Sequence, residues 1–241
     1  MKSIRALLWD VDGTLLDFLA SERAGIRKTF EVFGLGPCTD AMLAVYDPIN
    51  AKHWQKLERG ECSKRETMVN RFIEFFAQYG IETDAEAFND EYQRRLPDTI
   101  LFHPHGWEVL TALSHVYRQY CITNGNLPVQ RRKLKESGMD QVFDGVFISD
   151  DVGCEKPSIA YFRHVLDAIG CTPAECMVIG DSLTSDIRGA NNMGIPCIWF
   201  NPTHQPIREP LHADFIIEDL KEVATILGCP LSETDDSANR A

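Results

Sequence analysis

Short apolar runs that end in small or acidic residues alternate with segments of helical periodicity along most of the chain. The first run, residues 4–10, leads into a turn rich in aspartate and glycine, which is typical of a buried strand followed by a loop. Four similar runs and a weaker fifth follow, at residues 117–123, 145–149, 177–181, 195–200 and 215–217. Helical stretches separate most of them, at residues 127–137, 158–169 and 184–193. The alternation predicts an α/β fold, a doubly wound parallel sheet with helices on both faces.

Residues 17–97 interrupt this alternation, because they lack a convincing strand pattern and predict consecutive helices instead. The helical patterns cover residues 19–33, 41–60 and 85–95, and a further helix begins at a capping box of Ser63 and Glu66 and ends at Gly80. An insert of this size can hold a small core of its own. We therefore expect a Rossmann-like core of residues 1–16 and 98–228, an inserted α-helical cap domain of residues 17–97, and a flexible polar tail, 229–241.

Composition narrows the class of protein. The 241 residues are 44% hydrophobic and 25% charged, which is ordinary for a globular protein. A net charge of −12 argues against nucleic acid or an anionic membrane as a partner. No apolar run approaches the roughly 18 residues of a membrane span, and the first run contains Arg5, so we expect neither a transmembrane segment nor a signal peptide. The eight cysteines include no Cys-x-x-Cys pair, which favours structural thiols in a reducing cytoplasm.

The turn after the first strand carries candidate chemistry. Asp10 and Asp12 are two residues apart, so both carboxylates can converge above the carboxyl edge of the sheet, and Gly13 permits a sharp turn. Two close carboxylates repel each other unless a cation or a shared proton compensates. Asp-x-Asp-Gly is also a common turn sequence, so its catalytic interpretation depends on the other strand ends.

Three later strand ends carry groups that would complete a phosphate site. Thr123 and Asn124 offer a hydroxyl and turn amides to phosphate oxygens, and Lys156 offers a compact positive charge. Asp181 and Asp186 suit a hard cation that prefers oxygen ligands. Each group has a structural alternative such as helix capping, but complementary groups at four strand ends of one sheet favour a phosphoryl-transfer site.

These four segments resemble the motifs of the haloacid dehalogenase (HAD) superfamily in their usual order, and the insert resembles the helical cap of its subfamily I. The resemblance implies that Asp10 is a nucleophile that becomes an aspartyl phosphate, and that Asp12 is the general acid and base. It implies that Thr123 and Asn124 clamp the phosphate and that Lys156 offsets negative charge. It also implies a Mg²⁺ cofactor held by Asp10, the backbone carbonyl of Asp12, Asp181 and Asp186, the last directly or through water.

The need for cations agrees with this assignment, because a carboxylate that approaches a phosphate dianion is repelled. Asp12 also separates branches of the superfamily. The dehalogenases resemble this chain at the nucleophile but lack an acid two residues later, since halide leaves without a proton. The sequence therefore favours a phosphatase over a dehalogenase.

The insert bears on the substrate. Asn50, Trp54, Gly60 and the pair Arg71-Phe72 look like the cap of the YjjG-type pyrimidine 5′-nucleotidases, which implies hydrolysis of nucleoside monophosphates, including noncanonical pyrimidine ones. Phe18 or Trp54 could stack on a base, and Asn50 could hydrogen-bond to its edge. The alternative for all three side chains is packing within the cap.

Other functions stay open at this point. The nearest is a phosphatase of the same superfamily for a sugar phosphate, phosphoglycolate or another small metabolite, and a phosphomutase is a further option. From other classes, a signalling phosphoacceptor or an inactive binding protein remains, although the position of Asp10 after the first strand and the complete set of acids disfavour both. We expect a small phosphorylated metabolite as the partner, and a monomer or homodimer.

Two clusters favour structural interpretations. His103-Pro104-His105 lacks a third ligand nearby, so it predicts a loop and not a metal site. The basic run of residues 131–135 lies on a predicted helix, and in an acidic chain it predicts a solvated face.

Overall fold

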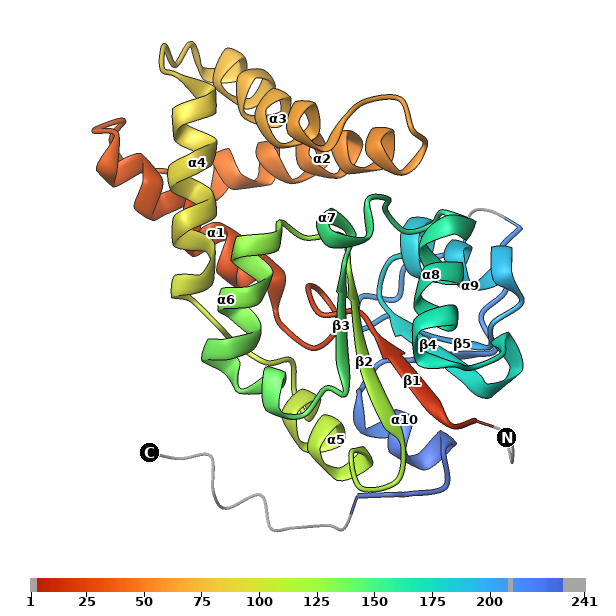
Figure 1. Ribbon diagram of the computed structural model, residues 1–241. Coiled ribbons are helices and arrows are strands. Elements are labelled where there is room, and N and C mark those ends of the chain that lie inside the picture. The colour runs from red at the N-terminus through yellow and green to blue at the C-terminus, as the bar shows by residue number, and fades with distance from the viewer. Residues whose placement is uncertain (1–3, 208–209, 232–241) are drawn as a thin grey trace, which may run out of the picture.

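The computed structural model describes residues 4–207 and 210–231, which form a six-stranded parallel sheet with helices on both faces (Figure 1). The strand order is β3-β2-β1-β4-β5-β6, so the two halves of the sheet diverge from β1 and β4. The strands are β1 (Ala6–Trp9), β2 (Arg118–Thr123), β3 (Gly145–Ile148), β4 (Cys176–Gly180), β5 (Cys197–Phe200) and β6 (Phe215–Ile217). The predicted doubly wound α/β fold is confirmed, and such sheets bind ligands where the strand order reverses.

The central strand β1 is buried on both faces, which explains its unbroken apolar run. Leu7 and Trp9 pack against one cluster, which includes residues of α5 (Gly106–Leu113) and α10 (Lys221–Ile226). Ala6 and Leu8 pack against the opposite cluster, which includes residues of α8 (Ile159–Ile169) and α9 (Arg188–Met193). Because side chains on both faces of β1 pack into the core, the carboxyl end of the strand is fixed in position.

The first four α-helices after β1 gather beyond the carboxyl edge of the sheet (Figure 1). They are α1 (Phe18–Val32), α2 (Asp40–Glu58), α3 (Lys64–Tyr79) and α4 (Ala85–Arg95). They share a cluster of aromatic rings, in which Phe72 and Phe76 each lie 4.9 Å from Phe88 between ring centroids. The predicted capping box of Ser63 and Glu66 is confirmed. The division into a core (1–16, 98–228) and a cap (17–97) stays a prediction, and we use both names for these segments.

The helices of the core follow the prediction in part. Helix α6 (Leu127–Ser137) has the predicted bounds, whereas α5 and α10 are short helices that the prediction did not include. The predicted strand end at Ser149 is wrong, because Ser149 begins α7 (Ser149–Val152). The remaining short helices are η1 (Leu96–Asp98), η2 (Met139–Gln141), η3 (Pro173–Glu175) and the π-helical turn η4 (Leu183–Ile187).

The predicted helix over 184–193 is divided into η4 and α9. The carbonyl of Ser182 accepts hydrogen bonds from the amides of both Asp186 and Ile187, at 3.0 and 3.1 Å, and the bond from Ile187 closes the wider ring of a π-helical turn. Gly180 allows this turn, because an added Cβ would lie 2.3 Å from the Asp186 carboxylate. The irregularity therefore brings the Asp186 side chain against the end of β4.

The ends of the described chain add two observations. None of the helices that the structure describes is both long enough and apolar enough to cross a membrane. Cys229 and Leu231, at the start of the predicted flexible tail, pack against the core cluster on the α5 face. The remainder of that predicted tail, residues 232–241, lies outside the described residues.

Candidate active site

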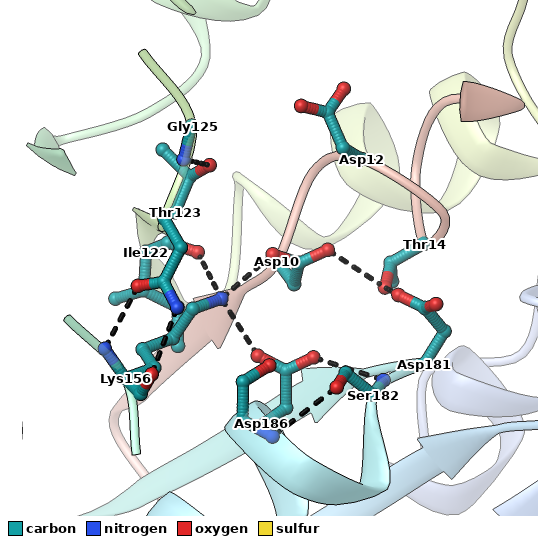
Figure 2. A network of polar contacts seen from close by, with 12 residues as sticks. Asp10, Asp12, Thr14, Ile122, Thr123, Gly125, Lys156, Asp181, Ser182 and Asp186 are labelled. Atoms are coloured by element: carbon teal, nitrogen blue, oxygen red, sulfur yellow. Dashed lines mark hydrogen bonds and ion pairs between the residues drawn. The ribbon is translucent and has the colours of Figure 1, made fainter. Parts of the chain in front are cut away.

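Three carboxylates meet at the carboxyl ends of β1 and β4 (Figure 2). Asp10 follows β1 and its amide donates to the carbonyl of Ile179 in β4 at 2.9 Å. Asp181 and Asp186 come from the segment after β4, and one oxygen from each of the three side chains lies within 4.8 Å of the others. Gly13 permits the approach, since its φ is +97° and an added Cβ would lie 2.6 Å from Asp181. The structure thus brings together three of the predicted metal ligands.

Lys156 is the cation of this group. Its side chain is 1% exposed, and its Nζ lies 2.7 Å from both Asp10 Oδ1 and Asp186 Oδ1. The same nitrogen donates to the carbonyl of Ile122 at 2.9 Å. Burial opposes the charged form, but the two carboxylates raise the pKa of Lys156 well above its ordinary value, so the side chain stays protonated.

The three carboxylates carry more negative charge than Lys156 can balance. Burial, reinforced by Asp186 and Asp181, raises the pKa of Asp10 well above its usual range although Lys156 opposes the shift. Burial and the nearby Asp186 raise the pKa of Asp181 to about 7. A divalent cation would relieve both shifts, and three carboxylates are oxygen donors of the kind that Mg²⁺ takes. The donor set therefore fits the predicted metal.

Thr14 is a member of the site that the sequence analysis missed. Its hydroxyl oxygen lies 3.2 Å from Asp10 Oδ2 and 2.9 Å from Asp181 Oδ1. A hydroxyl between two acids orients both of them, and its position two residues after Asp12 in the same loop was available as a signal.

The predicted phosphate clamp is divided between two roles. The Asn124 amide donates to the carbonyl of Lys156 at 2.8 Å and accepts from the Lys156 amide at the same distance, so the Asn124 side chain fixes the Lys156 segment. Thr123 lines the cavity above the carboxylates, and its hydroxyl accepts from the amide of Gly125 at 3.1 Å. The hydrogen bonds of Asn124 and Thr123 together stabilise the turn that would hold phosphate oxygens.

Asp12 lies apart from the other acids and points away from them (Figure 2). Lys133, 1% exposed, forms an ion pair with Asp12 Oδ1 at 2.6 Å, and the Gln130 amide donates to Asp12 Oδ2. The predicted solvated face is therefore wrong for Lys133, although it holds for the exposed Arg131 and Arg132. Gln130 and Lys133 are three residues apart and so share the face of α6 that turns toward the site.

A cavity of about 270 Å³ extends from these residues toward the cap. Asp10, Asp12 and Lys156 line it from the core, and Phe18 and Trp54 line it from the cap, as an aromatic recognition role requires. Asn50 does not line it. Its side chain is buried and bonded at both ends, to Glu22 and to Arg71, and of these three only Arg71 reaches the cavity wall.

Glu58, the last residue of α2, brings a carboxylate from the cap into the same cavity. Its Oε2 is buried and has no hydrogen-bond partner among the described residues. Burial raises the pKa of Glu58 to about 7, against a lowering hydrogen bond with Thr184. Nothing in its local sequence distinguished Glu58 from a surface helix residue, because its burial depends on how the cap meets the core.

The two histidines of the predicted loop also have defined places. His105, with φ of +62°, precedes α5, and its Nδ1 lies 2.7 Å from Asp219 Oδ1. The ring of His103 lies 5.2 Å from that of Phe200 between centroids. Neither belongs to the carboxylate group of Asp10, Asp181 and Asp186.

Comparison with known proteins identifies similar chains. A profile of haloacid dehalogenase-like hydrolases matches residues 4–194. The HAD-hydrolase YfnB of Bacillus subtilis is 34% identical over 228 residues, which cover 94% of this chain and 97% of YfnB. The crystal structure of YfnB bound to magnesium matches with a TM-score of 0.89, at 33% identity over 93% of this chain and 98% of that one.

Two further relatives carry names that state an activity. The pyrimidine 5′-nucleotidase PynA of Streptococcus pneumoniae is 34% identical over 200 residues, which cover 82% of this chain and 84% of PynA. The pyrimidine 5′-nucleotidase YjjG of Escherichia coli is 23% identical over 222 residues, which cover 92% of this chain and 96% of YjjG. The resemblance found in the sequence is confirmed at the level of the family.

Proposed function

The chain belongs to the haloacid dehalogenase-like hydrolases, and from that premise we propose that it is a Mg²⁺-dependent 5′-nucleotidase that hydrolyses pyrimidine nucleoside monophosphates, noncanonical ones included. The observation that carries the proposal is the continuity of the cavity, which runs from Asp10 and Lys156 to the aromatic rings of Phe18 and Trp54. A phosphate at one end and a flat base at the other match such a space. The names of PynA and YjjG support the same substrate class.

Asp10 is the proposed nucleophile. One of its oxygens attacks phosphorus in line, the bond to the leaving alcohol breaks, and an aspartyl phosphate forms on Asp10. Lys156 lowers the repulsion between the two negative groups, since its charge lies 2.7 Å from Asp10. Asp10, Asp181 and Asp186 would hold Mg²⁺, which supplies further positive charge to the phosphoryl oxygens when it is bound.

Asp12 is the proposed general acid and base. Its carboxylate faces the cavity and lies apart from the metal-binding acids, which suits a group that serves the leaving alcohol. It gives a proton to the departing oxygen and then takes one from the water that attacks the aspartyl phosphate. Lys133 and Gln130 hold the carboxylate in this position.

A second candidate is a phosphatase for a small metabolite that carries a carboxylate or a sugar. Arg71 on the cavity wall is the reason to test it, because guanidinium groups commonly bind carboxylates, although Glu22 already balances the charge of Arg71.

A substrate panel tests the two candidates. With Mg²⁺ present, phosphate release is measured for UMP, dUMP, CMP and AMP beside ribose 5-phosphate, phosphoserine and phosphoglycolate. We expect the pyrimidine nucleotides to have the highest kcat/KM. A sugar phosphate or a carboxylate-bearing substrate at the top of the panel would replace the nucleotidase proposal with the second candidate.

A further inference from the structure

Arg71 of α3 lines the cavity from the cap, although only 1% of the residue is exposed. Its Nε donates to the carbonyl of Met68 at 3.2 Å, and its Nη1 donates to Asn50 Oδ1 at 2.8 Å. Within residues 4–207 and 210–231, no hydrogen bond involves Nη2. Nη2 is not among the buried polar atoms of the described residues that lack a partner, so it is open to the cavity, where an acceptor on a ligand can take its hydrogen bond in place of water.

The charge of Arg71 is balanced inside the cap. Asn50 accepts from Arg71 and donates to Glu22 Oε1 at 2.9 Å, so its amide links the two charged groups. Arg71 Nη1 lies 3.9 Å from the same oxygen, and the hydroxyls of Tyr46 and Tyr92 also donate to it, each at 3.4 Å. Arg71 therefore offers a hydrogen-bond donor to the cavity, while Glu22 balances its positive charge.

The surroundings of this pair decide what kind of acceptor fits. The guanidinium carbon lies 5.0 Å from the centroid of the Phe72 ring and 5.3 Å from that of Tyr92. Such a wall cannot solvate a second full negative charge, whose binding would leave the pair with an excess of anion. A neutral carbonyl takes the hydrogen bond without that cost. The geometry fits a ring carbonyl better than a carboxylate.

We propose that Arg71 Nη2 donates to a ring carbonyl of the pyrimidine base, while Glu22 and Asn50 hold the guanidinium in place and exclude carboxylate-bearing substrates. The inference rests on the proposed nucleotidase function and names the group that recognises the base. The C2 carbonyl is common to uracil, thymine and cytosine, so one donor serves all three. Arg71 thus takes the role of hydrogen bonding to the base that the sequence analysis gave to Asn50, and Asn50 becomes a positioning residue.

The test compares UMP with ribose 5-phosphate, which keeps the phosphate and sugar but has no base. Removal of Arg71 alone would leave the buried Glu22 without a balancing positive charge, so the main variant is the charge-balanced double change Arg71→Met with Glu22→Gln. Assays at pH 8 with Mg²⁺ give kcat/KM for both substrates, and thermal melting checks the fold. We expect the ratio of UMP to ribose 5-phosphate to fall by about 10- to 100-fold, which is the range for a hydrogen bond from a charged donor.

Two further variants separate recognition from structure. Arg65→Met removes an exposed guanidinium from the same helix outside the cavity, and we expect the ratio to stay as in the wild type. Glu22→Gln alone leaves Arg71 as an unbalanced cation, so we expect kcat/KM for phosphoglycolate to rise relative to UMP. A rise of at least several-fold supports the charge-balance argument, and no rise contradicts it.

The outcomes that overturn the inference differ from those that overturn the proposed function. An unchanged ratio in the folded double variant, or an equal loss for both substrates, contradicts a contact between Arg71 and the base. Wild-type hydrolysis of UMP no faster than that of ribose 5-phosphate contradicts the nucleotidase proposal itself, whatever the variants do. A wild-type preference for phosphoglycolate that depends on Arg71 replaces the neutral acceptor with a carboxylate.

Discussion

The core wall and the cap wall of the cavity are built on different principles. In the core, Lys156 contacts two acids directly, with its Nζ 2.7 Å from an oxygen of Asp10 and from an oxygen of Asp186. In the cap, Arg71 and Glu22 lie on separate helices and are joined through Asn50, and the guanidinium packs against the rings of Phe72 and Tyr92. The core wall concentrates charge for a reaction, whereas the cap wall balances its charge and leaves one donor for a ligand. Loss of a core group should therefore stop chemistry, and loss of a cap group should change selectivity.

The largest expected effect is at the nucleophile. Asp10→Asn removes the attacking oxygen but keeps the shape of the side chain, so we expect kcat to fall by about 10⁴-fold or more for every substrate. The fold should persist, because Lys156 keeps its contact with Asp186. Phosphate release measures the loss of activity, and the melting temperature shows whether the fold persists. Phosphate release at the wild-type rate by this variant would reject the assignment.

A smaller loss is expected where the core holds Asp12. Lys133→Met removes the ion pair with Asp12, and we expect kcat/KM for UMP to fall by about 100-fold, within the range for a general acid–base residue. The loss should be smaller for p-nitrophenyl phosphate, whose leaving group departs without a proton. The exposed Lys135 on the same helix provides the control, Lys135→Met, with no expected change. Equal losses for both substrates would indicate a purely structural role for Lys133.

In the cap, Trp54→Ala tests the aromatic half of recognition. Base stacking on an aromatic side chain is worth about 1–3 kcal/mol, so we expect kcat/KM for UMP to fall by about 10-fold. Ribose 5-phosphate has no base to stack, and its kcat/KM should fall much less. If both substrates lose activity alike, Trp54 packs within the cap and does not contact the base.

The smallest effects concern stability. Burial raises the pKa of Asp181 in the core and of Glu22 in the cap, each to about 7. The folded chain therefore binds more protons than the unfolded chain between about pH 4 and pH 7, so the free energy of unfolding falls as pH rises through this window. We expect the melting temperature in chelator to decrease over that range.

The pH dependence of the melting temperature also distinguishes the core wall of the cavity from the cap wall. Saturating Mg²⁺ should remove the Asp181 part of the decrease, because a bound cation favours the ionised carboxylate. Glu22→Gln should remove the Glu22 part whether or not Mg²⁺ is present, and the part due to Glu58 in the cap should remain. A pH dependence that Mg²⁺ leaves unaltered would contradict a cation among the core carboxylates.

The sequence predicted the core wall better than the cap wall. The strand ends at Asp10, Thr123 and Asp181 could be recognised because each motif is local and because parallel strands bring their carboxyl ends to one edge. Even there, Lys133 was assigned to the surface, since its burial depends on which face of α6 meets the site.

In the cap, helix boundaries were predictable from caps and periodicity, but partners were not. Arg71, Asn50 and Glu22 are joined across three helices, and no spacing along the chain encodes that contact. Glu58 is similar, because its unpartnered oxygen becomes buried only where the cap meets the core. Tertiary packing fixes these groups, so recognition was less predictable than reaction chemistry.

The central claim, that Asp10 attacks phosphorus in a cation-dependent step, is tested most directly by trapping the covalent intermediate. The wild-type enzyme is mixed with Mg²⁺ and UMP that carries the label in its phosphate, and the reaction is quenched in acid within the first turnover. The protein is then digested, and the labelled peptide is identified by mass spectrometry. We predict phosphate on Asp10 in the presence of Mg²⁺ and none with excess chelator or in Asp10→Asn. Label on another residue, or full turnover in chelator, would contradict the account.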